Sequence, residues 1–504
     1  MQTDSNPAVP SEADAVVIGA GFGGLGAALG LGATGRRVLL VEALRYPGGC
    51  ASTFEKAGAR YEAGATLFAG LDDGALFPRL LGARGLTVPW ERPATPIRLL
   101  APGLDLPVSA DKARFVDLLC ARHPDAAAGI RRFFAWQGAV ADALWPALAD
   151  AGRLPPFDAD GLRFHLARLP RLAALARWVG RPAGAALRAA GVHGLAPLRL
   201  WADCICQISV QCGVDEAEGP FGLSTMDYPF RGVGHPVGGI GALADALVAA
   251  VRHDGGEVRF ATRAQALTRA PDGRWAVTLR GGHTVRAPLV FANVLPQGLH
   301  ALRGPDAPAA RLRPWADAVA AGWGAAMLYL QVDADAPLPA EGHHVEIVDD
   351  PAAPLHSGNH LFVSVSPAAE RRAPGGRRTV TVSTHLPAGL GQGPDAAAAI
   401  GAVHARMDAA LARHLPALNG AIAHHLTASP RTWERFTRRA DGRVGGIPRR
   451  AGLRAYDGLR AAPVEPGLWL VGDSAFPGQS TLAAALGGLR AARAATGGSA
   501  WWAR

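Results

Sequence analysis

Three glycines near the N-terminus, Gly19, Gly21 and Gly24, follow the spacing Gly-x-Gly-x-x-Gly, and Glu42 comes about twenty residues later. Gly19 permits a tight turn, Gly21 lets the backbone approach a pyrophosphate, and Gly24 lets a helix pack close to a strand. A helix N-terminus attracts phosphate, and a carboxylate at Glu42 can hold a ribose hydroxyl. These residue types in this order predict a dinucleotide-binding site.

The elements around the glycines support this interpretation. Residues 14–18 are mostly apolar and predict a buried parallel strand, an Ala/Leu/Gly helix follows the glycines, and residues 37–42 predict a second strand. A lone glycine motif is a weak signal, but here strand, glycines, helix, strand and acid occur in sequence.

Two further stretches of small residues follow closely. Gly48 and Gly49 come after Pro47 and predict a turn with exposed backbone amides. Gly64, Ala65 and Thr66 form a second passage against which a flat ring could lie. Each alone would be an ordinary turn, but their closeness to the glycine motif favours a second approach to the cofactor.

The C-terminal section carries another strong signal. An apolar strand over 468–471 ends at Gly472 and Asp473, and a helix of small residues begins near Thr481. Asp473 could accept hydrogen bonds from the ribityl hydroxyls of a flavin, whose pyrimidine edge would face the helix N-terminus. We therefore expect the two ends of the chain to bind one flavin.

Composition limits the remaining possibilities. The 504 residues are 49% apolar, which suits a large core and more than one domain. The net charge is +9, mostly from arginine, but no aromatic-interleaved basic motif indicates nucleic-acid binding. Cys204, Cys206 and Cys212 cluster without a zinc-type spacing, so we expect buried reduced thiols, no metal and a cytoplasmic location.

The middle of the chain suggests a second domain. Residues 75–222 read as largely helical, 323–335, 343–348, 360–366 and 378–385 read as strands of a second sheet, and 394–415 as a helix. A glycine-rich loop at 231–241 precedes an amphipathic helix, and strands are expected at 257–260 and 288–292. No strand precedes that loop, so it is not a second dinucleotide motif.

Within the helical region, residues 161–202 hold seven arginines and no acid, together with Trp178 and Trp201. Such a surface could lie on anionic lipid, or it could be an ordinary solvated face over a core. Outside the glycine motif, the sequence has no long apolar stretch without charges, so we expect no membrane-spanning helix.

Together these motifs resemble those of the FAD-dependent carotenoid desaturase and isomerase family, within the wider amine-oxidase-like flavoproteins. The resemblance is strongest at 14–70, 228–262 and 467–494, and 48–54 with 472–480 look most like carotenoid 3,4-desaturases. It implies an α/β fold with a Rossmann-like FAD domain at 13–74, 224–300 and 440–504. A mixed substrate domain facing the membrane would comprise 75–223 and 301–439.

The resemblance also implies roles for individual residues. FAD would be bound without a covalent link, with Val258 near its adenine. The residues expected to contact it are Gly19, Gly21, Gly24, Glu42, Gly48, Gly49, Ala65, Thr66, Val258, Gly472 and Asp473. His235 and Glu62 are the candidates for catalysis, and His235 could instead be a loop histidine that caps backbone carbonyls.

The expected reaction is desaturation of a carotenoid polyene at C-3,4, by hydride transfer to flavin N5 and proton loss to a weak base or water. A quinone or oxygen would reoxidise the flavin, and the protein would lie on the inner membrane face. The alternatives are redox-neutral cis/trans isomerisation on reduced FAD, a retinoid saturase-like reduction, and a non-catalytic isoprenoid-binding escort protein. An amine oxidase fits less well because no aromatic-cage signature is present.

Overall fold

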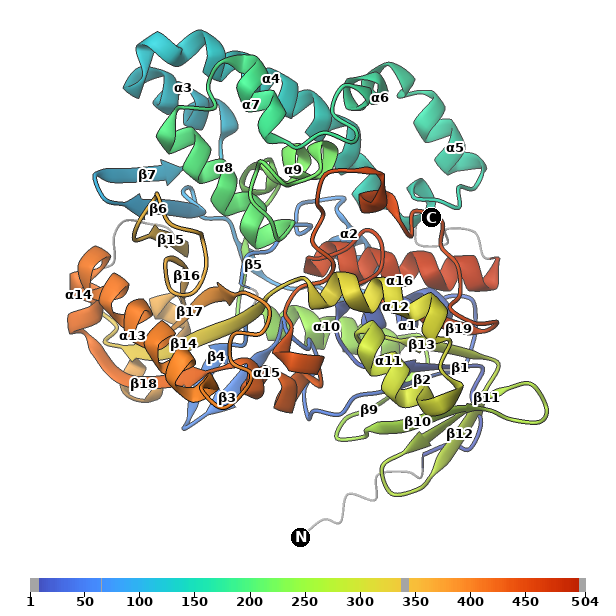
Figure 1. The fold of residues 1–504 in the computed structure, drawn as a ribbon. Coiled ribbons are helices and arrows are strands. Elements are labelled where there is room, and N and C mark those ends of the chain that lie inside the picture. Colours follow the sequence, from blue (N-terminus) through green and yellow to red (C-terminus); the bar gives the residue numbers. More distant parts are fainter. Residues whose placement is uncertain (1–8, 65, 337–343, 498–504) are drawn as a thin grey trace.

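The computed structural model describes residues 9–64, 66–336 and 344–497 (Figure 1). Its first sheet has five parallel strands in the order β19-β13-β1-β2-β9. Their bounds are β1 Ala15–Ile18, β2 Val38–Val41, β9 Glu257–Arg259, β13 Leu289–Ala292 and β19 Leu468–Leu470. β13 pairs with β1 on one side and with β19 on the other, so the two ends of the chain lie in one sheet.

Three helices cover one face of this sheet: α1 (Phe22–Gly32), α10 (Ile240–His253) and α16 (Thr481–Thr496). α1 and α16 pack closely because glycines face each other: a Cβ on Gly26 would overlap the Ala485 carbonyl, and one on Gly488 would overlap the Gly23 carbonyl. The other face packs against the antiparallel strands β10 (Ala264–Arg269), β11 (Trp275–Leu279) and β12 (Thr284–Ala287).

The second sheet has seven strands in the order β18-β14-β17-β16-β15-β6-β7. Their bounds are β6 Ile97–Ala101, β7 Leu104–Val108, β14 Gly324–Val332, β15 His344–Val348, β16 His360–Val365, β17 Arg378–Leu386 and β18 Ile422–Ala428. One face is aliphatic and packs against α13 (Ala396–His414). The opposite face is more polar, and part of it lines the cavity described below.

A layer of helices covers the end of the second sheet (Figure 1, upper part). Its main members are α3 (Lys112–Arg122), α4 (Ala127–Leu144), α5 (Ala159–Leu166), α6 (Leu169–Ala176), α7 (Gly184–Ala190), α8 (Ala196–Ser209) and α9 (Gly219–Thr225). The largely helical prediction for 75–222 is therefore correct except at β5 (Trp90–Glu91), β6 and β7, and the last two of these extend the second sheet. None of the described helices is long and apolar enough to cross a bilayer.

Of the two interpretations of 161–202, the one that places Trp178 and Trp201 on an exposed basic face is wrong. Their exposed fractions are 3% and 1%, because both indole rings pack into the core beneath the helices. Arg188 and Arg199 pair with Asp215, so these two arginines are also neutralised within the protein.

Most of the strands predicted for both sheets occur where the sequence placed them, within one or two residues. Two helices pack differently from the expected division into domains: α2 (Leu76–Gly82) joins the core around α1, and Leu312 of α12 (Ala309–Ala320) joins the core beneath the first sheet. The exact division at 74/75 and 300/301 stays a prediction.

Candidate functional site

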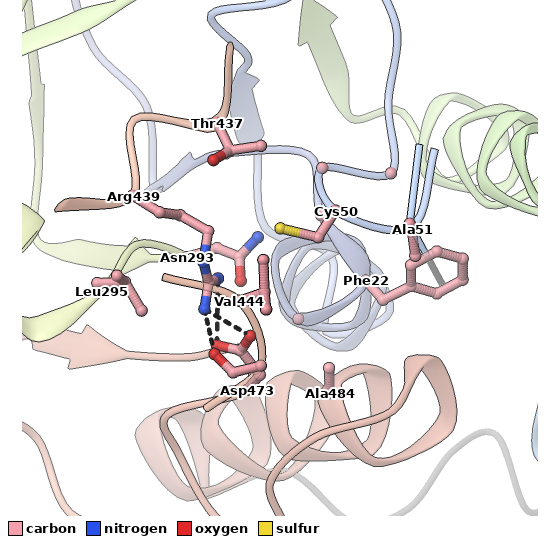
Figure 2. A pocket seen from close by; sticks show the side chains of 18 of the residues that line it. Phe22, Cys50, Ala51, Asn293, Leu295, Thr437, Arg439, Val444, Asp473 and Ala484 are labelled. Atoms are coloured by element: carbon pink, nitrogen blue, oxygen red, sulfur yellow. Dashed lines mark hydrogen bonds and ion pairs between the residues drawn. The ribbon is translucent and has the colours of Figure 1, made fainter. Parts of the chain in front are cut away.

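A cavity of about 590 Å³ lies between the first sheet, the second sheet and the helical layer. Segments from both ends of the chain and from the middle line it (Figure 2). Figure 2 shows Phe22 and Cys50 from the N-terminal segment on one side, and Asp473 and Ala484 from the C-terminal segment on another. A volume of this size is typical of sites for small molecules and cofactors.

The N-terminal glycines form one wall of the cavity. Gly19, with a φ of 97°, begins the turn, and Gly21 is the N-cap of α1 without any side-chain cap. The Gly48 amide donates to the Ala20 carbonyl at 2.9 Å, which holds the second glycine turn against the first. The uncapped N-terminus of α1 therefore opens into the cavity, where it suits a phosphate group.

Glu42 lies at the end of β2 and lines the cavity. Its carboxylate accepts the backbone amides of Ala20 at 2.7 Å and Leu44 at 2.8 Å. Burial raises the pKa of this carboxyl, and the backbone amides partly oppose the shift. The two amides fix the carboxylate and leave it lone pairs for a ribose hydroxyl.

The C-terminal segment supplies the facing wall through Gly472 and Asp473. Gly472 has a φ of 107°, and a Cβ there would come 2.5 Å from Asn293 Oδ1. Arg439 donates to both carboxylate oxygens of Asp473, at 2.8 and 3.4 Å (Figure 2). Arg439 could not be predicted from the sequence, because nothing near residue 439 resembles a motif.

Several polar atoms that line the cavity lack a hydrogen-bond partner among the described residues. They are Thr66 Oγ1, Gln211 Oε1, Gln479 Oε1 and Thr481 Oγ1. A buried polar atom without a partner costs free energy, so these atoms favour a polar ligand in the cavity. With the glycine turns and two helix N-termini, they fit a dinucleotide that ends in a polar ring system.

Two residues predicted to contact the cofactor lie elsewhere. Gly24 does not line the cavity: it packs α1 against β1, since a Cβ there would overlap the Gly19 carbonyl. Val258 is buried in β9 and does not line the cavity either. Ala65 lies outside the described residues.

His235 and Glu62 do not line the large cavity: they line a small second one, which Thr66 also borders. His235 Nε2 lies 2.7 Å from Glu370 Oε1. Arg372 bridges the two acids by donating to both Glu62 and Glu370. This buried ion network favours a structural role for both predicted catalytic residues, and their catalytic role stays a prediction.

The far wall of the cavity is a row of side chains across three strands of the second sheet. Met327, Ser383 and Phe362 are register partners on β14, β17 and β16, so they point to the same face. Ile205 and Ile208 of α8 face them. Among the described lining residues, the imidazole is that of His385. Burial lowers the pKa of His385 to about 3, and the charges of His360 and His356 lower it by smaller amounts.

The chain is similar to several known proteins. The family model of an NAD(P)-binding Rossmann-like domain matches residues 17–82. Prolycopene isomerase of Arabidopsis thaliana is 25% identical over 95% of this chain and 82% of its own length. Phytoene desaturase (neurosporene-forming) of Rhodobacter capsulatus is 53% identical over 53 residues, 10% of each chain.

The chain is a relative of the carotenoid desaturases and isomerases. A solved structure of putrescine oxidase bound to putrescine matches with a TM-score of 0.60 at 16% identity, covering 96% of this chain and 98% of that one. The fold is therefore the Rossmann-like, two-sheet fold of the amine-oxidase-like flavoproteins. The Rossmann-like motif and these relatives indicate that the dinucleotide bound by this chain is FAD.

Proposed function

We propose that the chain is an FAD-dependent oxidoreductase that desaturates a carotenoid-type polyene. The observation that carries the proposal is the continuity of one cavity: the glycine turns and Asp473 line one end, and the row Met327, Ser383 and Phe362 lines the other. An apolar polyene could therefore lie beside the cofactor within the same cavity. The relatives support a polyene as the substrate class.

FAD, when bound, supplies an acceptor for the hydride that leaves the polyene. The protein's part is to hold the polyene against the sheet face and to keep water out. A polyene cation is a strong acid, so a weak base is enough to remove the remaining proton. His385 suits this task because it lines the cavity and burial keeps its imidazole neutral.

A redox-neutral cis/trans isomerisation is the second candidate. It is favoured by one observation: the relatives that match over 95% of this chain are prolycopene isomerases, whereas the desaturase matches over 10%. The same cavity would serve it, with FAD in the reduced form. The C-3,4 bond is proposed as the site of reaction only if the protein is a desaturase.

Product mass separates the two candidates. The purified protein would be incubated with a carotenoid in liposomes, and the pigments would be separated by liquid chromatography with mass detection. A product lighter by two hydrogens supports desaturation, and a product of equal mass but changed retention supports isomerisation. An unchanged pigment with a colourless protein would favour an isoprenoid-binding escort protein instead.

We also propose that FAD is held without a covalent bond and is reoxidised by a quinone or oxygen. Boiling or acid precipitation should release the whole flavin into the supernatant. A flavin that stays with the pellet would contradict non-covalent binding.

A peripheral membrane location follows from the apolar substrate, and the structure offers one surface for it. Leu162, Leu166 and Leu169 on α5 and α6 are each at least 50% exposed, and Arg171 lies exposed beside them. Leucines with nearby arginines suit the interface of an anionic bilayer. We propose that this hairpin, rather than Trp178 or Trp201, contacts the membrane.

Flotation on anionic liposomes tests the hairpin. The double variant Leu166→Asp/Leu169→Asp should lose flotation, while the matched variant Leu453→Asp, at a 73% exposed leucine elsewhere, should keep it. Equal flotation of both variants would contradict the assignment.

A further inference from the structure

Three side chains from separate elements converge behind the far wall of the cavity. Cys204 lies on α8, Glu346 on β15 and His360 at the start of β16. One potential ligand atom from each, a thiol sulfur, a carboxylate oxygen and an imidazole nitrogen, lies within 4.8 Å of the other two. The three residues have exposed fractions of 0%, 1% and 2%, so the cluster is closed to bulk solvent.

A hydrogen bond between the Cys204 thiol and the Glu346 carboxylate accounts for only part of this convergence. His360 Nε2 lies 3.7 Å from Glu346 Oε2, which is too far for a hydrogen bond. His360 Nε2 and Glu346 Oε1 both lack a hydrogen-bond partner among the described residues. Leaving such atoms buried and unpaired is costly. Two ligands of one tetrahedral zinc ion lie about 3.4 Å apart, which is close to the observed separation.

The charges within the cluster are also compatible with a bound cation. In the described part of the chain, the ion-pair partner of Glu346 is His360, with no lysine or arginine in range. A buried carboxylate without a compensating charge is unfavourable. A divalent ion would balance one carboxylate and one thiolate, and the neutral imidazole would complete three protein ligands.

We propose that Cys204 Sγ, Glu346 and His360 Nε2 bind a divalent metal ion, zinc by preference. A thiolate, an imidazole and a carboxylate form a ligand set that suits zinc, whereas magnesium and calcium prefer oxygen alone. Three protein ligands leave a fourth position for a water molecule. The ion would tie α8 to the second sheet next to Ile205 and Phe362, and so would hold two walls of the cavity together.

The proposal does not depend on the substrate, so it can be tested without any assay of turnover. The flavin-loaded protein, made without a histidine tag, is dialysed against zinc and then against metal-free buffer, and its zinc is measured by mass spectrometry. Wild type should keep about one zinc per chain. Cys204→Ala and Glu346→Gln should each lower the zinc content at least tenfold under the same dialysis.

The matched control is Cys206→Ala, which removes a buried thiol from the same helix, two residues from Cys204 and outside the cluster. It should keep the zinc. Cobalt loading gives an independent readout: wild type and Cys206→Ala should show thiolate-to-cobalt absorption in the difference spectrum, and Cys204→Ala should not. Glu346→Gln nearly preserves side-chain size, so it still tests the site if Cys204→Ala fails to fold.

Two results would overturn the proposal. One is wild-type protein that retains no zinc after loading and shows no cobalt spectrum, which would leave a buried thiol and carboxyl group. The other is zinc retention by Cys204→Ala and Glu346→Gln equal to that of wild type, which would place the ion elsewhere.

Discussion

Arg439 and Asp473 form an ion pair inside the cavity, with Nη2 of the arginine 2.8 Å from Oδ2 of the aspartate. Asp473 follows the last strand of the first sheet, whereas Arg439 follows α15 (Pro430–Thr437), which packs against the second sheet. Burial lowers the pKa of Arg439, but the charges of Asp473 and Cys50 and the hydrogen bond to Asp473 together outweigh burial and raise the pKa overall. Arg439 therefore stays charged, and its ion pair with Asp473 links the two halves of the cavity.

We predict that both members of this pair support flavin binding. Asp473→Asn and Arg439→Met should each lower the ratio of bound flavin to protein several-fold, because Asp473 loses either its charge or its orientation. The ratio is measured by absorbance after gel filtration. Arg435→Met, at an exposed position of α15, is the control and should leave flavin content unchanged. Full flavin content in both pair variants would remove Asp473 from the cofactor site.

Gly24 should matter for stability. Its Cβ would overlap the Gly19 carbonyl, so Gly24→Ala should force α1 away from β1 and cost about 1–3 kcal/mol or more of unfolding free energy. Gly82→Ala, at a helical glycine with open space around it, should be neutral or slightly stabilising. Chemical denaturation of both variants checks this, and equal stabilities would contradict the close-packing argument.

Substitutions of His385 and His235 should affect turnover and stability differently. His385→Phe should lower polyene turnover roughly a hundredfold with flavin content unchanged, because it removes a base from the cavity wall. His235→Asn should change turnover little and stability more, since His235 pairs with Glu370. Turnover of each variant is compared at equal flavin content. The opposite order would restore His235 as the catalytic candidate.

The ion network around Glu370 gives a pH dependence. Burial alone would raise the pKa of Glu370, but the hydrogen bond from His235 and the charge of Arg372 lower it to about 2 from an ordinary 4.5. The stabilisation is therefore present above about pH 4.5 and is lost as the pH falls towards 2. The difference in unfolding free energy between wild type and Glu370→Gln should shrink over that range. A difference that does not change with pH would contradict the pairing.

Ser383 offers a test of the cavity wall. Ser383→Phe adds bulk between its register partners Met327 and Phe362, so it should block the polyene and spare the flavin. Turnover should fall at least tenfold while the flavin spectrum stays unchanged. Normal turnover would place the polyene away from this sheet face.

The sequence predicted the elements with local signals well. β1, α1 and β2 were found because strand, glycine turn and helix carry a continuous pattern. β14, β15, β16 and β17 of the second sheet were found through their β-branched and alternating residues, whereas β18 was not predicted. β6 and β7 were missed because they lie in a long helical region, and pairing with β15 stabilises them there. Their partner lies more than 200 positions away, where no local pattern can indicate it.

The same limit explains the missed site residues. Arg439 and His385 belong to no motif, and only tertiary packing brings them into the cavity. Trp178 and Trp201 alternate with arginines and so indicated an exposed amphipathic face, yet packing of α8 against α4 buries Trp201. Cys204 reaches Glu346 and His360 through the fold, so no zinc-type spacing exists in the sequence.

The most direct test of the central claim is anaerobic mixing of the oxidised, flavin-loaded protein with a carotenoid in liposomes, followed by absorbance and product mass. The proposed desaturation predicts that the flavin absorbance bleaches as a product lighter by two hydrogens accumulates in equal amount. A flavin that stays oxidised beside a carotenoid of unchanged mass would contradict it.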